Sequence, residues 1–202
     1  MKTTIFTIKS HEVLTLIKKD SRLKKLFEVH SPLKVTLNHD PYEFLIYTII
    51  GQQISVKQAD TIFASVKTLT NNQCTPNEIA RLNDDSLTTV GIPNFKIAYI
   101  RELTKAFQSQ HFNLEKLNSL SQKDRINHLT QIPGIGPWSA EMFCMFVLAD
   151  KNLFSVTDTG LQNALKKYFN NPNLTIKKIR DMALLWEPYQ SIVAHYLWAY
   201  WD

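Results

Sequence analysis

A short segment in the second half of the chain combines two glycines with the residue types that begin a helix. Residues 129–140 read LTQIPGIGPWSA. Gly134 and Gly136 lack a Cβ, so an anion can approach their backbone, and Pro137 suits the first position of a helix. The amides of that helix's first turn, aided by the helix dipole, are suited to binding a phosphate. The segment therefore predicts an anion-binding turn between two helices, with an ordinary helix–helix turn as the alternative.

A carboxylate follows this turn at a position that also begins a helix. Asp158 lies 20 residues after Trp138, directly before Thr159. An aspartate there most often caps a helix, which is worth about 1 kcal/mol. Next to a phosphate-binding turn, the same charge would stabilise positive charge on the sugar of an extruded nucleotide as its base departs. The residues alone leave both roles open.

Helical spacing of apolar side chains is the main pattern elsewhere, so helices must position these residues. Pro41 after Asp40 and the capping residue Ser55 are start signals for two helices. Residues 3–8 are the only run with the character of a short strand. The other candidate helices cover residues 76–82, 84–90, 95–109, 121–130, 137–149, 159–169, 175–185 and 188–200. The sequence predicts an all-α protein of about ten short helices.

The composition is that of a soluble globular protein. The chain has 202 residues, of which 44% are hydrophobic and 20% are charged, which excludes extensive disorder. The longest apolar run, residues 142–149, is too short to span a membrane, and the N-terminus lacks a signal core. We therefore expect a cytoplasmic protein in which Cys74 and Cys144 are reduced thiols.

The charge balance permits a polyanionic partner. The formal net charge is +5, and basic residues cluster within residues 18–25 and 166–180. Such clusters are usually solvated helix faces, so they do not establish a partner. The six histidines show no His-x-x-x-His spacing, which argues against a zinc hydrolase.

The turn and the downstream Asp158 together resemble the helix–hairpin–helix DNA glycosylase superfamily. The chain is most similar to the compact form of its DNA-3-methyladenine glycosylase II branch. Three further segments match that branch in the same order: DPYEFL to IGQQISVKQA within residues 40–59, GIP with Lys96 and Tyr99 within residues 91–100, and WEPYQS to YLW within residues 186–198. The resemblance covers most of the chain and implies a cytoplasmic protein located with the genomic DNA.

The resemblance implies a two-lobed helical fold with the active site in the cleft between the lobes. The central lobe would comprise residues 41–150 and include the helix–hairpin–helix. The second lobe would combine residues 1–40 with residues 151–202.

The resemblance also assigns roles to individual side chains. Asp158 would be the catalytic carboxylate. Trp138 and Trp198 would form walls of the base pocket, where an indole face attracts a positively charged methylated purine. Tyr47 and Met142 are weaker candidates for the same pocket. Both tryptophans would be core residues on their type alone.

The remaining implied contacts are with the DNA backbone and the gap in the duplex. Gln53 would enter the gap left by the extruded base, and the amides of Gly134 and Gly136 would bind the phosphate next to the lesion. A structural sodium or potassium ion would be held by main-chain carbonyls of the hairpin, namely those of Thr130, Ile132 and Ile135.

The implied activity is hydrolysis of the N-glycosidic bond of alkylated purines, such as 3-methyladenine and 7-methylguanine, in duplex DNA. Strand-cutting relatives use a hairpin lysine as nucleophile, and Trp138 stands in that place, so we expect a monofunctional monomer that leaves an abasic site. No catalytic cofactor is expected, and two cysteines exclude a four-cysteine iron–sulfur cluster. Two alternatives are a glycosylase for deaminated or oxidised bases and a non-catalytic DNA-binding protein.

Two positions depart from the branch pattern. Gln190 stands where an arginine is usual, and Pro93 replaces a common serine. The first change would remove a phosphate contact or an ion pair, and the second would remove a phosphate donor.

Overall fold

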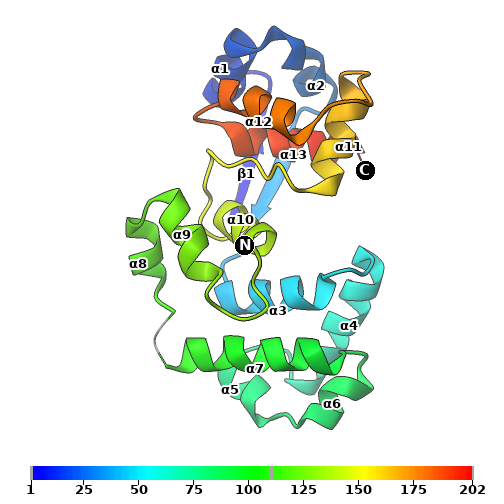
Figure 1. The fold of residues 1–202 in the computed structure, drawn as a ribbon, viewed down its shortest axis with the longest axis vertical. Coiled ribbons are helices and arrows are strands. Elements are labelled where there is room, and N and C mark those ends of the chain that lie inside the picture. The colour runs from blue at the N-terminus through cyan, green and yellow to red at the C-terminus, as the bar shows by residue number, and fades with distance from the viewer. Residues whose placement is uncertain (1, 110–111, 202) are drawn as a thin grey trace. The chain divides into compact units, whose positions relative to one another are not determined.

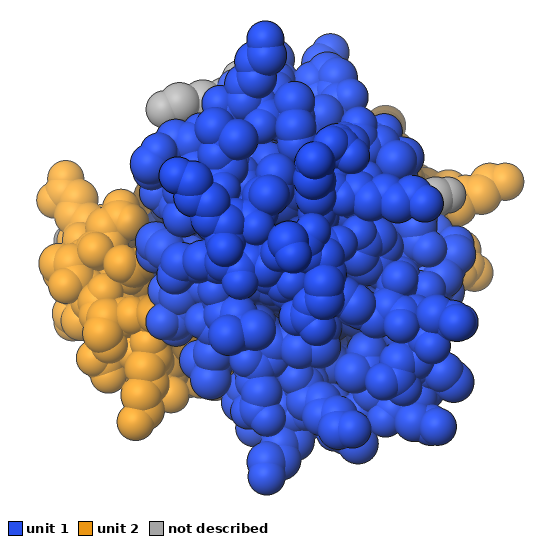
Figure 2. Space-filling view, turned by 90° about the horizontal axis from the view of Figure 1, so that it is seen from above, with its two compact units in different colours: residues 1–39, 144–202 blue, residues 40–143 orange. Residues whose placement is uncertain are grey.

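The computed structural model describes residues 2–109 and 112–201. Within them the chain forms thirteen α-helices, one short 3-10 helix and a two-stranded sheet (Figure 1). The predicted all-α class is therefore confirmed. The chain divides into two compact units, coloured separately in Figure 2: residues 1–39 with 144–202, and residues 40–143.

The unit that contains both termini, called the terminal unit below, consists of a small sheet and six helical segments. The antiparallel strands pair with Phe6 opposite Leu33. The aromatic side chains of Trp186 and Tyr196 are fully buried in its core. The elements are β1 (Lys2–Phe6), α1 (His11–Lys19), η1 (Ser21–Leu23), α2 (Lys24–Val29), β2 (Leu33–Leu37), α11 (Thr159–Tyr168), α12 (Ile176–Leu185) and α13 (Gln190–Trp201).

The second unit, called the central unit, is built around one long helix. This helix, α7, packs against α3, α5 and α6. The elements are α3 (Pro41–Gly51), α4 (Val56–Leu69), α5 (Pro76–Arg81), α6 (Asp84–Thr89), α7 (Asn94–Gln108), α8 (Leu114–Ser119) and α9 (Gln122–Leu129). Helix α10 (Pro137–Phe146) begins in this unit and ends in the terminal unit.

The predicted start signals are observed at the first two helices of the central unit. Asp40 Oδ1 accepts a hydrogen bond from Glu43 N at 2.9 Å, with Pro41 in the first turn of α3. At α4, the Ser55 hydroxyl accepts from Gln58 N at 3.3 Å, and Gln58 Oε1 accepts from Ser55 N at 3.1 Å. This reciprocal pair satisfies two amides that the helix itself leaves unpaired.

The chain passes from the central unit back to the terminal unit after residue 143. The predicted lobe boundary falls after residue 150. The intervening segment pairs with the terminal unit, because Asn38 N donates to Phe146 O at 2.9 Å. Helix α10 also ends three residues before the predicted end at residue 149, and Ala149 has a left-handed φ of 57°.

Several elements were not predicted. The strand β2 and the short helices α1, α2 and α8 fall outside the predicted ranges. The β2 sequence LKVTL alternates over only five residues, and the three helices have six to nine residues, so each gives a weak periodic signal.

Candidate functional site

Asp158 is the N-cap of α11, and its carboxylate also contacts α13. Asp158 Oδ1 accepts one hydrogen bond from Leu161 N at 2.7 Å and another from the Trp198 indole Nε1 at 3.3 Å. The residue is 9% exposed. A Cβ on Gly160 would lie 3.2 Å from Asp158 Oδ1, so glycine leaves room for this arrangement. The capping role is thus present, and the same atom is held by a tryptophan that the resemblance places in the base pocket.

Trp198 lies within an aromatic cluster of the terminal unit. Its ring stacks on Phe146 with the centroids 5.8 Å apart and 28° between the planes. The His195 ring lies 5.6 Å from Trp198 and 5.1 Å from Phe146. Burial lowers the pKa of His195 to about 4, so the imidazole is neutral at pH 7. These contacts fix the plane of the Trp198 ring and therefore the direction of its N–H group.

Sequence reasoning missed three members of this cluster: Gly160, Phe146 and His195. His195 stands three residues before Trp198 in α13, so helical spacing places both rings on one face. That spacing is a signal that could have identified His195. Phe146 comes from a distant segment, and no local pattern relates it to Trp198.

The hairpin connects α9 to α10 as predicted. Ile135 N donates to Ile132 O at 3.0 Å across the turn, and Ala140 N donates to Gly136 O at 3.0 Å in the first turn of α10. Ile135 is buried, whereas Gly136 and the turn up to Trp138 are exposed. The main chain is therefore accessible from Gly136 to Trp138, at the start of α10, as anion binding requires.

The two hairpin glycines meet different surroundings. Gly134 has a φ of +89°, and a Cβ there would lie 2.5 Å from Tyr99 Cβ. A Cβ on Gly136 would meet nothing within 4 Å. Gly134 is therefore needed for backbone conformation and for packing against α7, and the open approach to the backbone lies at Gly136.

The turn between α3 and α4 brings a second predicted residue next to the hairpin. Gln53 is exposed and has a left-handed φ of 60°. Its neighbour Gln52 donates from Nε2 to Gly134 O at 2.8 Å. Gln52, Tyr99 and residues 130–139 line a shallow hollow of about 520 Å³. The structure thus brings the 52–55 turn and the glycine hairpin together within the central unit.

The other predicted pocket residues are distributed over both units. In the central unit, Tyr47 is half-buried and donates from its hydroxyl to Asp60 Oδ1 at 2.9 Å; burial and this carboxylate raise its pKa. Met142 is 5% exposed and Trp138 is 40% exposed. Trp198 belongs to the terminal unit. Their joint role in one base pocket stays a prediction.

Of the two departures from the branch pattern, Gln190 has a side-chain contact that explains it, and nothing in the structure explains Pro93. Gln190 is 8% exposed and donates from Nε2 to Ala183 O at 2.9 Å, at the end of α12. Pro93 precedes α7, and its carbonyl accepts from Lys96 N at 2.9 Å. Gln190 therefore stabilises the junction of α12 and α13.

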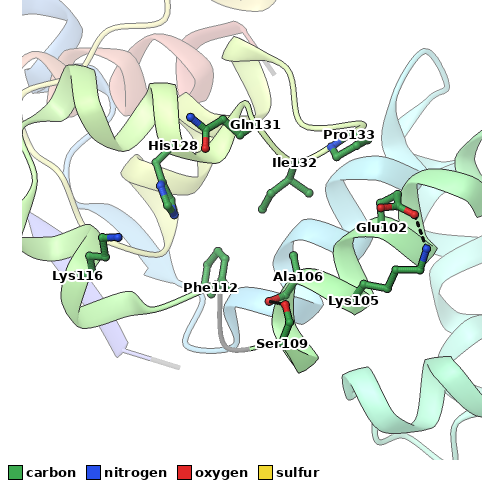
Figure 3. A pocket seen from close by; sticks show the side chains of 10 residues that line it. All are labelled: Glu102, Lys105, Ala106, Ser109, Phe112, Lys116, His128, Gln131, Ile132 and Pro133. Atoms are coloured by element: carbon green, nitrogen blue, oxygen red, sulfur yellow. Dashed lines mark hydrogen bonds and ion pairs between the residues drawn. The ribbon is translucent and has the colours of Figure 1, made fainter.

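A second hollow of about 470 Å³ also adjoins the hairpin, and Figure 3 shows its lining side chains. Lys105 and Glu102 form an ion pair of 2.6 Å at its edge. Of the predicted site residues, only Ile132 lines it. This hollow is therefore not the predicted base pocket.

Across the described part of the chain, none of the helices combines the length and apolar character that crossing a membrane requires.

Comparison with known proteins gives consistent matches. Residues 46–190 match the model of the HhH-GPD superfamily base excision DNA repair proteins. The chain is similar to DNA-3-methyladenine glycosylase 1 of Schizosaccharomyces pombe, with 29% identity over 88% of this chain and 79% of the relative.

Two solved structures resemble this fold closely. The DNA-3-methyladenine glycosidase of Bacillus halodurans superposes with a TM-score of 0.88, 31% identity, and coverage of 100% of this chain and 93% of that chain. The Schizosaccharomyces pombe 3-methyladenine DNA glycosylase Mag1, in complex with abasic DNA, gives a TM-score of 0.82, 28% identity, and coverage of 94% and 95%. The chain spans 64% of the length of two Bacillus subtilis relatives that it matches.

Proposed function

Because the chain belongs to the HhH-GPD superfamily of base excision DNA repair proteins, we propose that it is a DNA glycosylase that removes alkylated purines from duplex DNA. Its substrates are 3-methyladenine and 7-methylguanine. The observation that supports this most directly is the carboxylate of Asp158, held by Leu161 N and Trp198 Nε1 in a chain whose relatives are named as 3-methyladenine glycosylases.

The proposed reaction breaks the bond between C1′ of the sugar and the nitrogen of the base. The bonding electron pair leaves with the base. Because the methylated purine carries a positive charge, it becomes neutral when it receives this pair. The sugar becomes oxocarbenium-like, and the negative charge of Asp158 stabilises it. A water molecule then adds to C1′ and loses its proton, which Asp158 or solvent accepts. The products are the free base and an abasic site.

The aromatic side chains supply recognition of the base. An electron-rich indole face attracts a cationic purine more strongly than a neutral one, which favours methylated over normal bases. Trp198 has a fixed orientation suited to this role, because Phe146 and His195 pack against its ring. We assign Trp138, Tyr47 and Met142 to the same pocket on the family resemblance.

The central unit supplies binding to the DNA backbone. The accessible amides at Gly136 and the start of α10 would bind a phosphate next to the lesion, and Gln53 would fill the gap in the duplex. The carbonyl of Ile132 accepts one hydrogen bond, from Ile135 N, and keeps a second lone pair. This carbonyl, with those of Thr130 and Ile135, fits the donor chemistry of a structural sodium or potassium ion that would neutralise phosphate charge.

We further propose that the enzyme is monofunctional. A lyase step requires an amine that forms a Schiff base with C1′, and the hairpin has Trp138 at the position where the resemblance places that lysine. Borohydride treatment of the reacting complex should therefore trap no covalent protein–DNA product. A trapped adduct would contradict this part of the proposal.

The proposed activity is tested with duplex DNA that contains single defined lesions. The wild-type protein should release free 3-methyladenine and 7-methylguanine, and the Asp158→Asn variant should bind the same DNA but release almost none. Release of uracil, hypoxanthine or 8-oxoguanine instead would support a different glycosylase. Binding without release of any base would show a non-catalytic DNA-binding protein.

A further inference from the structure

Lys96 is a buried cation of the central unit with an unusual set of partners. The residue is 4% exposed, and its ammonium donates to Ile50 O at 2.8 Å and to Gln52 O at 2.7 Å. Burial lowers the pKa of this amine. The ammonium therefore binds main-chain oxygens at the C-terminal end of α3, where the helix leaves carbonyls unpaired and the dipole favours a positive charge.

These two carbonyls lie directly before the turn that contains Gln53. Gln53 has a left-handed φ of 60°, a backbone conformation that is unfavourable for a residue with a side chain. A short turn in such a conformation persists only when its surroundings fix it. Lys96 fixes the carbonyl of Gln52, the residue immediately before Gln53.

The same turn is fixed a second time, against the hairpin. The side chain of Gln52 donates from Nε2 to Gly134 O at 2.8 Å. Gly134 in turn packs against Tyr99, which lies three residues after Lys96 on α7. Residues with this spacing share one face of a helix. One face of α7 therefore contacts both the 52–55 turn and the glycine hairpin.

We propose that Lys96 is a positioning residue that holds Gln53 in register with the phosphate-binding hairpin. This inference rests on the proposed function, because it assigns Lys96 an effect on base release that acts through Gln53. The side-chain amide of Gln53 can help extrusion of a base only if the main chain that carries it keeps its conformation. The turn must therefore be rigid before DNA binds. Lys96 and Gln52 supply that rigidity.

The residue type at position 96 supports this role. An ammonium group carries three donors on a compact tip and can bind two carbonyls at once. A methionine of similar length would fill the same space but would leave the oxygens of Ile50 and Gln52 without this partner. Lys96→Met therefore removes the anchor and keeps most of the packing.

A double-mutant cycle on duplex DNA with one 7-methylguanine tests the proposal. The measured quantity is the single-turnover rate constant for base release by wild type, Lys96→Met, Gln53→Ala and the double variant. We expect Lys96→Met to slow release about tenfold in the wild-type background and less than twofold in the Gln53→Ala background, because coupled positions are not additive.

Matched controls separate positioning from a loss of stability. Lys105→Met makes the same substitution on the same helix, at a lysine whose side chain is 71% exposed, and should leave the rate unchanged. If Lys96→Met does not fold, Lys96→Gln replaces it in the cycle, because its shorter, neutral side chain lacks the ammonium that binds both carbonyls. A slowing by the same factor in both Gln53 backgrounds would overturn the proposal. If wild type releases no base, the proposed function itself fails, which is a distinct outcome.

Discussion

The indole nitrogen of Trp198 donates to Asp158 Oδ1 at 3.3 Å, and this oxygen also accepts from Leu161 N at 2.7 Å. One carboxylate oxygen therefore caps the N-terminus of α11 and connects this helix to α13. The helix cap and the proposed catalytic group are the same side chain, so structural and catalytic effects of a mutation must be separated by the choice of substitution.

Asp158→Asn should separate the two effects. Asparagine keeps an oxygen that accepts from Leu161 N and Trp198 Nε1, so we expect the free energy of unfolding to fall by less than about 1 kcal/mol. The negative charge is lost, and base release should slow by about 100-fold or more. Chemical denaturation and single-turnover release measure the two quantities.

Asp158→Ala is the matched comparison. It removes the charge and also the cap, so it should slow base release as strongly and lower the free energy of unfolding by about 1 kcal/mol more than the asparagine variant. Equal free energies of unfolding for the two variants would show that the hydrogen bond from Leu161 N contributes nothing to the stability of the protein. A fully active Asp158→Asn variant would exclude Asp158 as the catalytic carboxylate.

Trp198→Phe tests the contact between the indole and Asp158. Phenylalanine keeps an aromatic ring against Phe146 but has no N–H group, so the carboxylate loses one of its two identified donors. We expect base release to slow about tenfold, which corresponds to about 1.4 kcal/mol, close to the lower limit of about 1.5 kcal/mol for a hydrogen bond to a charged group. The dissociation constant for lesion-containing DNA should change less than the rate constant.

The control substitution lies on the same helix. Trp201 is 42% exposed and contacts the Lys167 ammonium, 5.4 Å from its ring. Trp201→Phe should retain the rate of wild type. If both variants slow release equally, the effect of Trp198→Phe comes from α13 as a whole and not from the bond to Asp158.

The sequence allowed the elements with strong local signals to be predicted. The glycine hairpin, the cap at Ser55 and the cap at Asp158 each depend on residues within four positions of one another, and all three appear where expected. The strand β2 was missed because it exists through pairing with β1, some thirty residues earlier in the chain. Short elements that depend on distant partners leave little trace in a local pattern.

The same distinction applies to the site. Asp158, Gln53 and Gly136 could be identified from motifs, but their supporting residues could not. Lys96 appeared in a matching segment, yet its bonds to the carbonyls of Ile50 and Gln52 arise from the packing of α7 against α3. Every residue has a main-chain carbonyl, so the sequence carries no signal that shows which carbonyl a lysine will bind.

The two hairpin glycines should respond differently to alanine. In Gly134→Ala the new Cβ would lie 2.5 Å from Tyr99 Cβ at a φ of +89°, so strain and overpacking should lower the free energy of unfolding by about 3 kcal/mol. In Gly136→Ala the Cβ meets open space, so stability should change by less than about 0.5 kcal/mol. DNA binding should nevertheless weaken, because the methyl group occupies the approach to the backbone amides.

Chemical denaturation and titration of labelled duplex test this pair of glycines. A Gly136→Ala variant that binds DNA as tightly as wild type would show that the phosphate does not approach the backbone there. A Gly134→Ala variant as stable as wild type would require the hairpin to move away from α7.

His195 should make the terminal unit less stable in acid. Its pKa in the folded protein is lowered to about 4 by burial, whereas an unfolded histidine has a pKa of about 6.5. Between these values the unfolded chain binds a proton that the folded chain does not, so stability falls as the pH is lowered through 6.5 and levels off below about 4. At pH 4.5 this contribution is about 2 kcal/mol relative to pH 7.

His195→Gln isolates this effect from the protonation of carboxylates. The variant cannot gain a proton at position 195, so its loss of stability between pH 7 and pH 4.5 should be smaller than that of wild type by about 2 kcal/mol. The two proteins are compared by urea denaturation at each pH, and the acidic residues contribute equally to both. Parallel curves for wild type and variant would mean that His195 becomes protonated without unfolding, in which case its ring near Phe146 and Trp198 must be accessible to water.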